Sequence, residues 1–424
     1  MEPKTSVSTD RIDRILETCR RHLGMEIAFV GRYVDEDREL MRVSADIELP
    51  MGSGFREPRE NSYCWHILEG RLPEMIQDAA DHPFAQTLAI TEMLPVGCHL
   101  DIPLRLSDGS LFGSFCALSR QPDRTITKRD MGVLQAFAQL AAEHIEATLD
   151  DDVRHAALSK RIGETIETGN VTIVHQPIHT LGNGRPVGVE CLARFPDAEQ
   201  RGPDLWFNEA AEIGLGLELE LLAVRNALAT LPYVPKHCYM TVNASPETVL
   251  SGQLEKVLDQ GDRKRLVIEI TEHHKVVDFA RLAQMLDKLK PKARIAIDDV
   301  GAGYAGLRHI VDLAPDILKL DMSLTRDIHI SPARRALTSA MVEFSREIGC
   351  VLVAEGIEVR KERETLSRLG VTHGQGYFYS RPLPVVKAQQ WLLSEGRSAP
   401  GEAATSREDP ARAAFSPYPT RKRA

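Results

Sequence analysis

In the second half of the chain, short apolar runs alternate with longer stretches whose apolar residues recur at helical spacing. Runs of this length are typical of buried strands, and the amphipathic stretches between them are typical of helices that cover a sheet. Eight such runs within about 240 residues predict a closed barrel rather than an open sheet. The predicted strands are residues 171–177, 187–193, 239–243, 266–270, 294–298, 317–320, 351–354 and 377–379, and the predicted helices include 207–228, 279–289, 333–348 and 385–393.

A different pattern fills residues 10–147. Thr9 or Asp10 can cap a predicted helix with one apolar face. The turn Ser107-Asp108-Gly109 joins two strand-like runs and is a strong hairpin signal. We therefore expect an α+β domain, an antiparallel sheet flanked by helices. Its predicted strands are residues 26–33, 40–45, 97–106 and 111–118.

Residues 127–166 predict one long helix. Thr127 and Asp130 resemble a capping box at its start. Apolar residues then recur on one face, namely Leu134, Phe137, Ala138, Ala141, Ile145 and Leu149. Such a face fits two arrangements: a parallel dimer whose helices carry a signal between domains, or a terminal helix that packs on its own sheet. The sequence leaves both open.

Several predicted strands of the second half carry polar side chains near their C-terminal ends. Alternation places Thr241 and Asn243 on one face of their strand, Lys319 and Asp321 on one face of another, and Glu269 near the end of a third. The active sites of barrels lie at this end of the strands. Because an unpaired buried charge costs several kcal/mol, this repetition predicts a functional site.

The run 294–304 is the most informative of these strands, because it ends in Asp298 and Asp299 and continues into a glycine-rich loop. Adjacent carboxylates in an apolar setting repel each other unless a cation lies between them. Successive strand residues point to opposite faces, so both carboxylates can face one ion only if the strand ends at Asp298. An isolated Asp-Asp-x-Gly is more often a surface turn, but the polar positions on the other strands favour an ion site.

The side chains expected to converge are mostly carboxylates, joined by amides and one lysine. Oxygen ligands of this kind suit Mg²⁺ or Mn²⁺ rather than zinc. Their number suggests two cations bridged by Asp298, the arrangement used for in-line displacement at phosphorus. Lys319 can orient water or stabilise developing charge, and Arg194 can clamp a phosphate. The set is Glu190, Asn243, Glu269, Asp298, Asp299, Lys319, Asp321, Glu355 and Gln375.

Length, charge and composition limit the kinds of protein that this chain can be. A chain of 424 residues should hold two or three domains, and its net charge of -9 argues against nonspecific binding of a nucleic-acid polymer. We expect no membrane span, because no apolar run approaches about 20 residues. The seven cysteines include no CxxC pair and predict reduced thiols in a cytoplasmic protein. The polar segment 396–424 is expected to be disordered.

Residues 161–393 contain a series of short runs in a fixed order. These are Gln176-Pro177-Ile178, Val189–Phe195, Val242-Asn243, Glu269–Glu272, Asp298–Tyr304, Lys319–Asp321, Ala354–Glu358 and Gln375–Tyr377. Because these runs occur in the family's order, residues 161–393 resemble the EAL domain, a family of cyclic di-GMP phosphodiesterases. The family implies a modified TIM (β/α)8 barrel with one antiparallel strand, which strand patterning alone does not indicate.

The resemblance also implies a role for each site residue. One Mg²⁺ or Mn²⁺ would be held by Glu190, Asn243, Glu269 and Asp298, and the second by Asp298, Asp299 and Glu355. Catalytic roles would fall to Lys319 and Glu355 at the water, Gln375 at a metal-bound water and Glu272 as the anchor of loop 299–306. The substrate side would comprise Gln176, Leu192 and Arg194, supported by Asp321 and Glu358.

Four positions depart from the family's pattern, one of them Val359, which stands where threonine is usual. The signature Glu-Ala-Leu reads Glu190-Cys191-Leu192, and Cys191 should face outward. Val300 stands where phenylalanine is usual and Ala302 where threonine is common. Because this loop couples metal binding to dimerisation in the family, the changes bear on regulation and rate. None of the implied metal ligands is missing.

Residues 10–147 contain a second set of short runs. These are Ser62-Tyr63-Cys64, Ile76–Ala79, Pro95-Val96-Gly97, Ile102-Pro103-Leu104 and Ser107–Gly113. On these runs the segment resembles a GAF domain, a family that senses small molecules or redox signals and often dimerises. Cys64, Cys98 and His99 are candidate ligand or redox positions, with ordinary core packing as the alternative.

Together these resemblances predict a homodimeric enzyme that opens cyclic di-GMP to linear pGpG, regulated through residues 127–166 by an unknown signal at the GAF-like domain. Two alternatives stay open. One is a catalytically silent receptor for cyclic di-GMP or a protein, suggested by Val300 and Ala302. The other is an unrelated Mg²⁺-dependent barrel enzyme.

Overall fold

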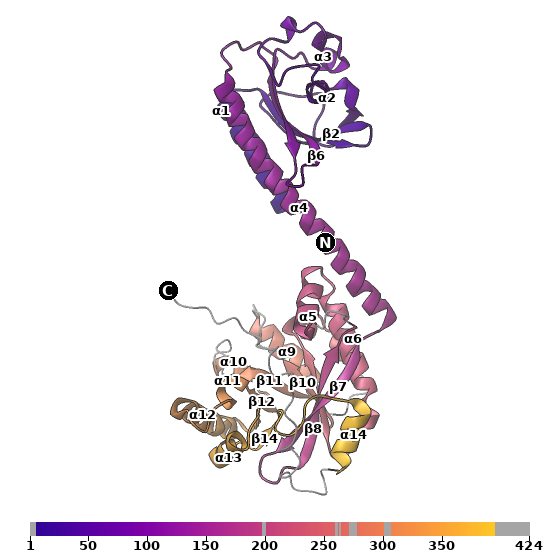
Figure 1. Cartoon of the computed structure of the whole chain (residues 1–424). Coiled ribbons are helices and arrows are strands. Elements are labelled where there is room, and N and C mark those ends of the chain that lie inside the picture. Colours follow the sequence, from indigo (N-terminus) through magenta and orange to yellow (C-terminus); the bar gives the residue numbers. More distant parts are fainter. Residues whose placement is uncertain are drawn as a thin grey trace, which may run out of the picture. The chain divides into compact units, whose positions relative to one another are not determined.

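The computed structural model describes residues 6–196, 201–258, 262, 264–270, 278–300 and 307–394. The chain divides into two compact units, Met1–Ala157 and Leu158–Ala424 (Figure 1). The predicted disordered segment 396–424, Glu272 and residues 301–306 lie outside the described residues.

The first unit is built on a six-stranded antiparallel sheet of order β3-β2-β1-β6-β5-β4, which confirms the predicted α+β domain. Two short strands, β3 and β4, were not predicted because runs of three and two residues carry no alternation signal. The strands are β1 (Ile27–Val34), β2 (Asp37–Ala45), β3 (Arg56–Pro58), β4 (Met75–Ile76), β5 (Cys98–Arg105) and β6 (Leu111–Ser119).

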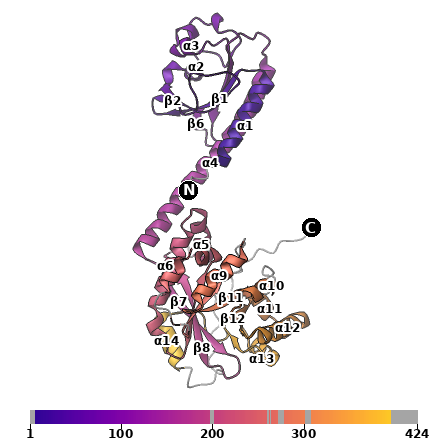
Figure 2. The same ribbon diagram turned by 180° about the vertical axis from the view of Figure 1, so that it is seen from behind.

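Helices cover both faces of this sheet. On one face, α1 (Ser6–Leu23) and α4 (Lys128–Thr168) pack side by side, as Figures 1 and 2 show. On the other, α2 (Tyr63–Leu68), α3 (Ala89–Met93) and the segments around them enclose a second apolar cluster. The residues of β5 and β6 therefore alternate between two cores.

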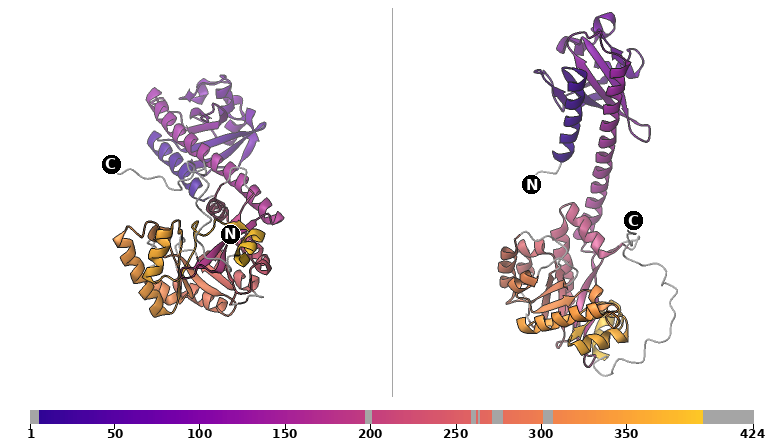
Figure 3. Two further views of the ribbon diagram at one scale, coloured as in Figure 1. Left: turned by 60° about the horizontal axis from the view of Figure 1, so that its bottom comes forward. Right: turned by 90° about the vertical axis from the view of Figure 1, so that its left-hand side faces the viewer.

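The 41-residue helix α4 is continuous (Figure 3). Leu134, Ala138, Ala141 and Ile145 are buried in the core that the sheet shares with α1, so most of the predicted apolar face packs within its own unit. Leu149 is 38% exposed. Farther along, in the second unit, Leu158 and Ile162 are buried, and Ile162 packs with residues of α5 and α6.

The second unit is a closed barrel of eight strands, as predicted. Strands β8 to β14 run parallel in sequence order, whereas β7 pairs antiparallel with both β8 and β14 and closes the ring. The strands are β7 (Thr172–Thr180), β8 (Pro186–Arg194), β9 (Tyr239–Ala244), β10 (Leu266–Ile270), β11 (Arg294–Val300), β12 (Ile317–Leu320), β13 (Val351–Ala354) and β14 (His373–Gly374), and a short β15 (Leu383–Pro384) pairs with β7.

The predicted strand at residues 377–379 is wrong. These residues form a turn, in which Tyr379 N donates to Gly376 O, and the eighth strand is β14, just before it. The cause is Gly376, where an added Cβ would lie 2.2 Å from Ile357 O. Only glycine lets the chain pass this close to its neighbour and turn.

Helices surround the barrel, and Figures 1 and 2 both place α12, α13 and α14 at its periphery. The predicted helix 207–228 is instead two helices, because Gly214 adopts a left-handed φ of 79° between them. The helices are α5 (Pro203–Glu212), α6 (Gly216–Ala229), α7 (Pro246–Leu250), α8 (Gln253–Val257), α9 (Phe279–Leu289), α10 (Leu307–Leu313), α11 (Met322–Thr325), α12 (Pro332–Ile348), α13 (Arg360–Leu369) and α14 (Val385–Ser394).

The interior of the barrel is layered. Inward side chains form an apolar cluster that includes Val267, Ala296, Ile317 and Val353. Two residues farther along the same strands, on the same inward face, come Glu269, Asp298, Lys319 and Glu355. The apolar layer thus closes the floor beneath a polar layer at the C-terminal ends of the strands.

Candidate active site

Lys319 is the centre of the polar layer. Its side chain is 2% exposed, and its Nζ contacts one carboxylate oxygen on, or directly after, each of four barrel strands. The distances are 2.6 Å to Glu355 Oε1, 2.8 Å to Glu269 Oε2, 3.1 Å to Asp298 Oδ1 and 3.6 Å to Glu190 Oε1. Carboxylates that are widely separated in the sequence therefore meet at one point.

The electrostatics show an excess of negative charge at this point. Burial raises the pKa of Glu269 to about 8, although Lys319 counteracts the rise. The pKa of Glu355 is likewise raised well above its usual value, first by burial. Burial alone would lower the pKa of Lys319, but the surrounding carboxylates, Asp298 first, raise it well above normal. One ammonium group does not neutralise four carboxylates, so the site favours additional positive charge.

Two amide side chains tie these acids together. Gln375 Nε2 donates to Glu190 Oε2 at 2.6 Å and to Glu355 Oε1 at 3.0 Å. Asn243 Nδ2 approaches Glu190 Oε1 at 3.4 Å. Gln375 Oε1 is buried and accepts no hydrogen bond from the described residues. This oxygen is an unused acceptor at the edge of the cluster, suited to a water or another donor.

Asp298, Asp299 and Glu355 form the part of the site that best fits a cation, because each offers an oxygen within 4.8 Å of the others. The strand does not end at Asp298 as predicted, since β11 extends to Val300. Instead its pairing with β12 shifts register between Ile297 and Val300, and Asp299 adopts a left-handed φ of 54°. This bulge turns adjacent carboxylates toward the same mouth, which regular alternation forbids.

The three residues predicted to contact substrate lie on β7 and β8. Gln176 pairs in register with Glu190, and Leu192 and Arg194 follow Glu190 at two-residue intervals on β8. Burial lowers the pKa of the Arg194 guanidinium, which donates to Ala193 O at 2.7 Å.

Two supporting residues do not join the carboxylate cluster. Asp321 caps α11 by accepting from Ser323 N at 2.9 Å. Glu358 forms an ion pair with Arg326 at 2.5 Å, and both side chains are more than 40% exposed. Glu272 lies outside the described residues.

Sequence reasoning missed a polar aromatic group near Arg194. The Arg381 guanidinium lies 4.4 Å from the centre of the Tyr377 ring. Tyr377 is 53% exposed and can offer a stacking surface. Its role was hidden because residues 377–379 were assigned to a strand, although exposed aromatic residues are a signal for binding.

Comparison with known proteins identifies the class. The EAL domain family matches residues 155–382, more than half of the chain. The chain therefore belongs to the EAL domain family. The GAF domain family matches residues 9–145, so the first unit is a GAF domain.

Named relatives share this barrel. The chain is 27% identical over 317 residues to the probable cyclic di-GMP phosphodiesterase PdeB of Escherichia coli, covering 72% of this chain and 55% of that protein. It is 31% identical over 238 residues to a cyclic di-GMP phosphodiesterase of Pseudomonas aeruginosa, covering 52% and 40%. The chain thus spans about half the length of these relatives or less.

Solved structures agree with the fold. The PaMucR phosphodiesterase in complex with cyclic di-GMP is 25% identical, with a TM-score of 0.50, and the match covers 55% of this chain and 99% of that one. An EAL domain protein of Listeria monocytogenes is 24% identical with a TM-score of 0.50, covering 55% and 96%. No described helix has the length and hydropathy of a membrane span.

Proposed function

We propose that this protein is a metal-dependent phosphodiesterase that hydrolyses cyclic di-GMP to linear pGpG. The observation that carries the proposal is the contact of the buried Lys319 with carboxylates from four barrel strands. The names of the relatives from Escherichia coli and Pseudomonas aeruginosa support it, as does the cyclic di-GMP bound to PaMucR.

The donor set fits two divalent cations, Mg²⁺ or Mn²⁺. Carboxylate and amide oxygens dominate, the negative charge exceeds what Lys319 neutralises, and Gln375 keeps an unused buried oxygen. One cation would be held by Glu190, Asn243, Glu269 and Asp298, and the other by Asp298, Asp299 and Glu355. When bound, such cations neutralise phosphoryl oxygens and acidify a water.

The chain's own groups have distinct tasks in this proposal. Lys319 and Glu355 are in contact at 2.6 Å, so an ammonium donor and a carboxylate acceptor lie side by side, where both can reach the same water. Gln375 fixes Glu355 and Glu190 in place through its amide. Arg194, with Gln176 and Leu192 beside it, would bind the substrate's phosphate and base. Glu272 would anchor the loop that follows β11, with Asp321 and Glu358 as supports.

The second candidate is a silent receptor of cyclic di-GMP or a protein. Val300 favours it, because the residue is buried at 4% exposure where the family's usual side chain is the larger phenylalanine. The intact oxygen cluster favours hydrolysis, since a receptor has no need of Lys319 among carboxylates.

The deciding experiment uses the full-length protein with cyclic di-GMP and Mn²⁺ or Mg²⁺, with pGpG measured by chromatography. Hydrolysis that stops on chelation supports the enzyme. Tight nucleotide binding without turnover, in a sample shown to bind metal, supports the receptor and rejects the enzyme.

We further propose that the GAF domain regulates turnover and that the protein is a cytoplasmic homodimer. All seven cysteines are free thiols, as expected in a reducing compartment. Comparing turnover of the full chain with residues 155–424, which keep the buried Leu158 and Ile162, tests the regulation. A monomeric mass at micromolar concentration would reject the dimer.

A further inference from the structure

The GAF domain contains a sealed cluster of thiols beside an imidazole and a carboxylate. Cys64 Sγ lies 3.1 Å from Cys116 Sγ, and Cys116 Sγ donates to Asp101 Oδ1 at 2.6 Å. One ring nitrogen of His99 lies within 4.8 Å of both sulfur atoms. All four residues are at most 2% exposed.

Local structure explains why these groups meet. Asp101 on β5 and Cys116 on β6 are direct partners in the antiparallel register. His99 lies two residues before Asp101 and shares its face of the sheet. Cys64 comes from α2, which Ser62 caps by accepting from Trp65 N at 3.3 Å.

We propose that Cys64, His99 and Cys116 bind a thiophilic divalent cation, Zn²⁺ in the first place, with Asp101 completing a four-ligand set. Two thiolates with an imidazole and a carboxylate are donors that zinc accepts, in a number that suits its tetrahedral preference. Nothing in this inference depends on the barrel's activity.

Two buried polar atoms beside the thiols have no hydrogen-bond partner in the part of the chain that the structure describes, and this favours a bound cation over a cluster that holds only two thiols. His99 Nδ1 and Asp101 Oδ2 are buried and have no hydrogen-bond partner among the described residues. Leaving such atoms unpaired is destabilising, because each has lost contact with water without gaining a partner. A disulfide between Cys64 and Cys116 would leave both of them unpaired, whereas a bound cation gives the imidazole and the carboxylate a shared partner.

The distance between the two sulfur atoms is close to the distance that zinc binding requires. A disulfide requires about 2.05 Å between sulfur atoms, and two thiolates on one zinc at about 2.3 Å stand about 3.7 Å apart. The observed 3.1 Å is therefore about 0.6 Å short of the zinc geometry. Rotation of the Cys64 side chain would open the pair by this amount.

A bound cation would also offset negative charge. Two thiolates, Asp101 and Glu57 carry four negative charges, and a divalent cation with the buried Arg38 guanidinium carries three positive charges. Arg38 Nη1 contacts Cys64 Sγ at 3.4 Å, in the position of an outer-shell donor that orients a thiolate ligand. Glu57 holds Arg38 from its other side through an ion pair.

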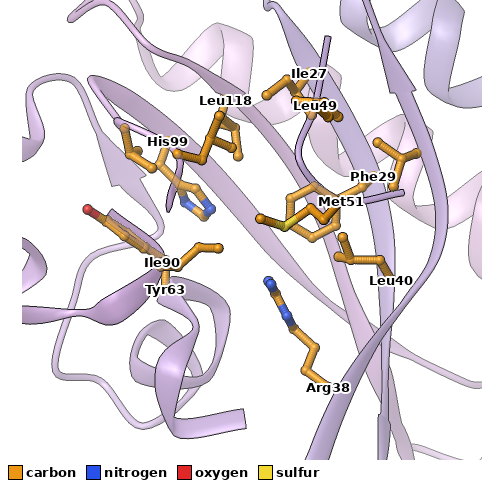
Figure 4. Close-up of a pocket in the computed structure, with 13 residues that line it drawn as sticks. Ile27, Phe29, Arg38, Leu40, Leu49, Met51, Tyr63, Ile90, His99 and Leu118 are labelled. Carbon is orange, nitrogen blue, oxygen red and sulfur yellow. The ribbon is translucent and has the colours of Figure 1, made fainter. Parts of the chain in front are cut away.

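A small cavity of about 40 Å³ lies beside the cluster on the side of His99. Arg38, Tyr63 and His99 are its polar lining, and Figure 4 shows the Arg38 guanidinium and the His99 ring both pointing into it. His99 stacks on Tyr63 with ring centres 5.2 Å apart, which fixes the imidazole plane. Binding would release the two thiol protons to solvent.

Cobalt titration of the full-length reduced protein tests this proposal. Co²⁺ replaces zinc in thiolate sites and gives an intense sulfur-to-cobalt band in the near ultraviolet, which the oxygen donors of the barrel cannot produce. We expect about one equivalent of Co²⁺ to saturate this band and Zn²⁺ to displace it. The double variant Cys64→Ser/Cys116→Ser should lose the band, and His99→Gln should weaken it.

Matched controls are available in the same unit. Cys19 and Cys98 are buried in the other core of the sheet, so Cys19→Ala and Cys98→Ala should keep the band. If the double variant does not fold, the wild-type titration alone still decides. The absence of a thiolate band in reduced wild-type protein overturns the proposal, as does a full band in the folded double variant. A Cys64–Cys116 disulfide before reduction, with no cobalt band after it, would also overturn the proposal and assign the pair to redox chemistry.

Discussion

The mouth of the barrel and the thiol cluster of the GAF domain each hold one buried cation against several acidic groups. Around Lys319 the partners are carboxylates, and Asp298, at 13% exposure, keeps contact with solvent. Around Arg38 the partners are Glu57 and Cys64, and all three are nearly inaccessible. The comparison teaches that an open cluster of oxygen donors suits exchange of substrate and water, whereas a sealed cluster with sulfur donors suits a permanently held ion.

Replacing Lys319 tests the barrel side of this comparison most strongly. Lys319→Met should lower kcat by about 10³–10⁴-fold, because the water loses its positively charged donor. Metal binding should not weaken, since a competing cation is removed from the carboxylates. Chromatographic assay of pGpG and Mn²⁺ titration would measure the two effects separately. Lys288→Met, on the exposed face of α9, is the control, and a kcat within tenfold of wild type for Lys319→Met would contradict the assignment.

Removing one carboxylate should weaken metal binding, which the replacement of Lys319 should leave intact. Asp298→Asn should weaken Mn²⁺ affinity and lower kcat/KM by about 10²-fold, because Asp298 would bridge both cations. Higher Mn²⁺ concentration should restore part of this loss but should not rescue Lys319→Met. The exposed Asp312→Asn serves as the control. Equal metal affinity in Asp298→Asn and wild type would remove Asp298 from the ligand set.

Substitutions in the thiol cluster of the GAF domain should change the stability of that domain rather than the turnover of cyclic di-GMP. Arg38→Met leaves Glu57 buried without its partner and should lower the free energy of unfolding of the GAF domain by about 3 kcal/mol. The double variant Arg38→Met/Glu57→Leu should recover part of this loss. Scanning calorimetry of the full chain would measure both. If the double variant is as unstable as the single one, the ion pair is not the cause.

The smallest expected effect concerns a buried neutral imidazole in the barrel. Burial lowers the pKa of His179 to about 4, below its unfolded value of about 6.5. Its contribution to stability is therefore present above pH 6.5 and is lost as the pH falls toward 4. Linkage gives a loss of about 2 kcal/mol between pH 7 and pH 5.

His179→Phe isolates this contribution, because phenylalanine keeps a ring stacked on Tyr379, whose centre lies 4.3 Å away, but does not titrate. Denaturant unfolding at both pH values should show a shallower loss of stability in the variant. Equal losses in variant and wild type would show that other groups account for the acid sensitivity of the barrel.

Sequence patterning determined the barrel well where strands were long enough to alternate. The sequence predicts the residues of β9 to β13 within a few positions, and it predicts that the polar residues near their C-terminal ends share one site. β14 was missed because two residues show no period, and the aromatic run at Tyr377 was more strand-like. The break between α5 and α6 was missed because Gly214 interrupts an otherwise continuous apolar face.

The sequence by itself therefore determined the two domains' fold classes and the oxygen donors of the barrel, because alternation and motif order are local properties of the chain. Only the tertiary structure decided that a bulge at Asp299 aims two adjacent carboxylates at one mouth. It also decided that Cys64 and Cys116, 52 positions apart, lie in contact. Sequence spacing carries no such information, because strand register and helix docking set these distances through packing across the whole domain.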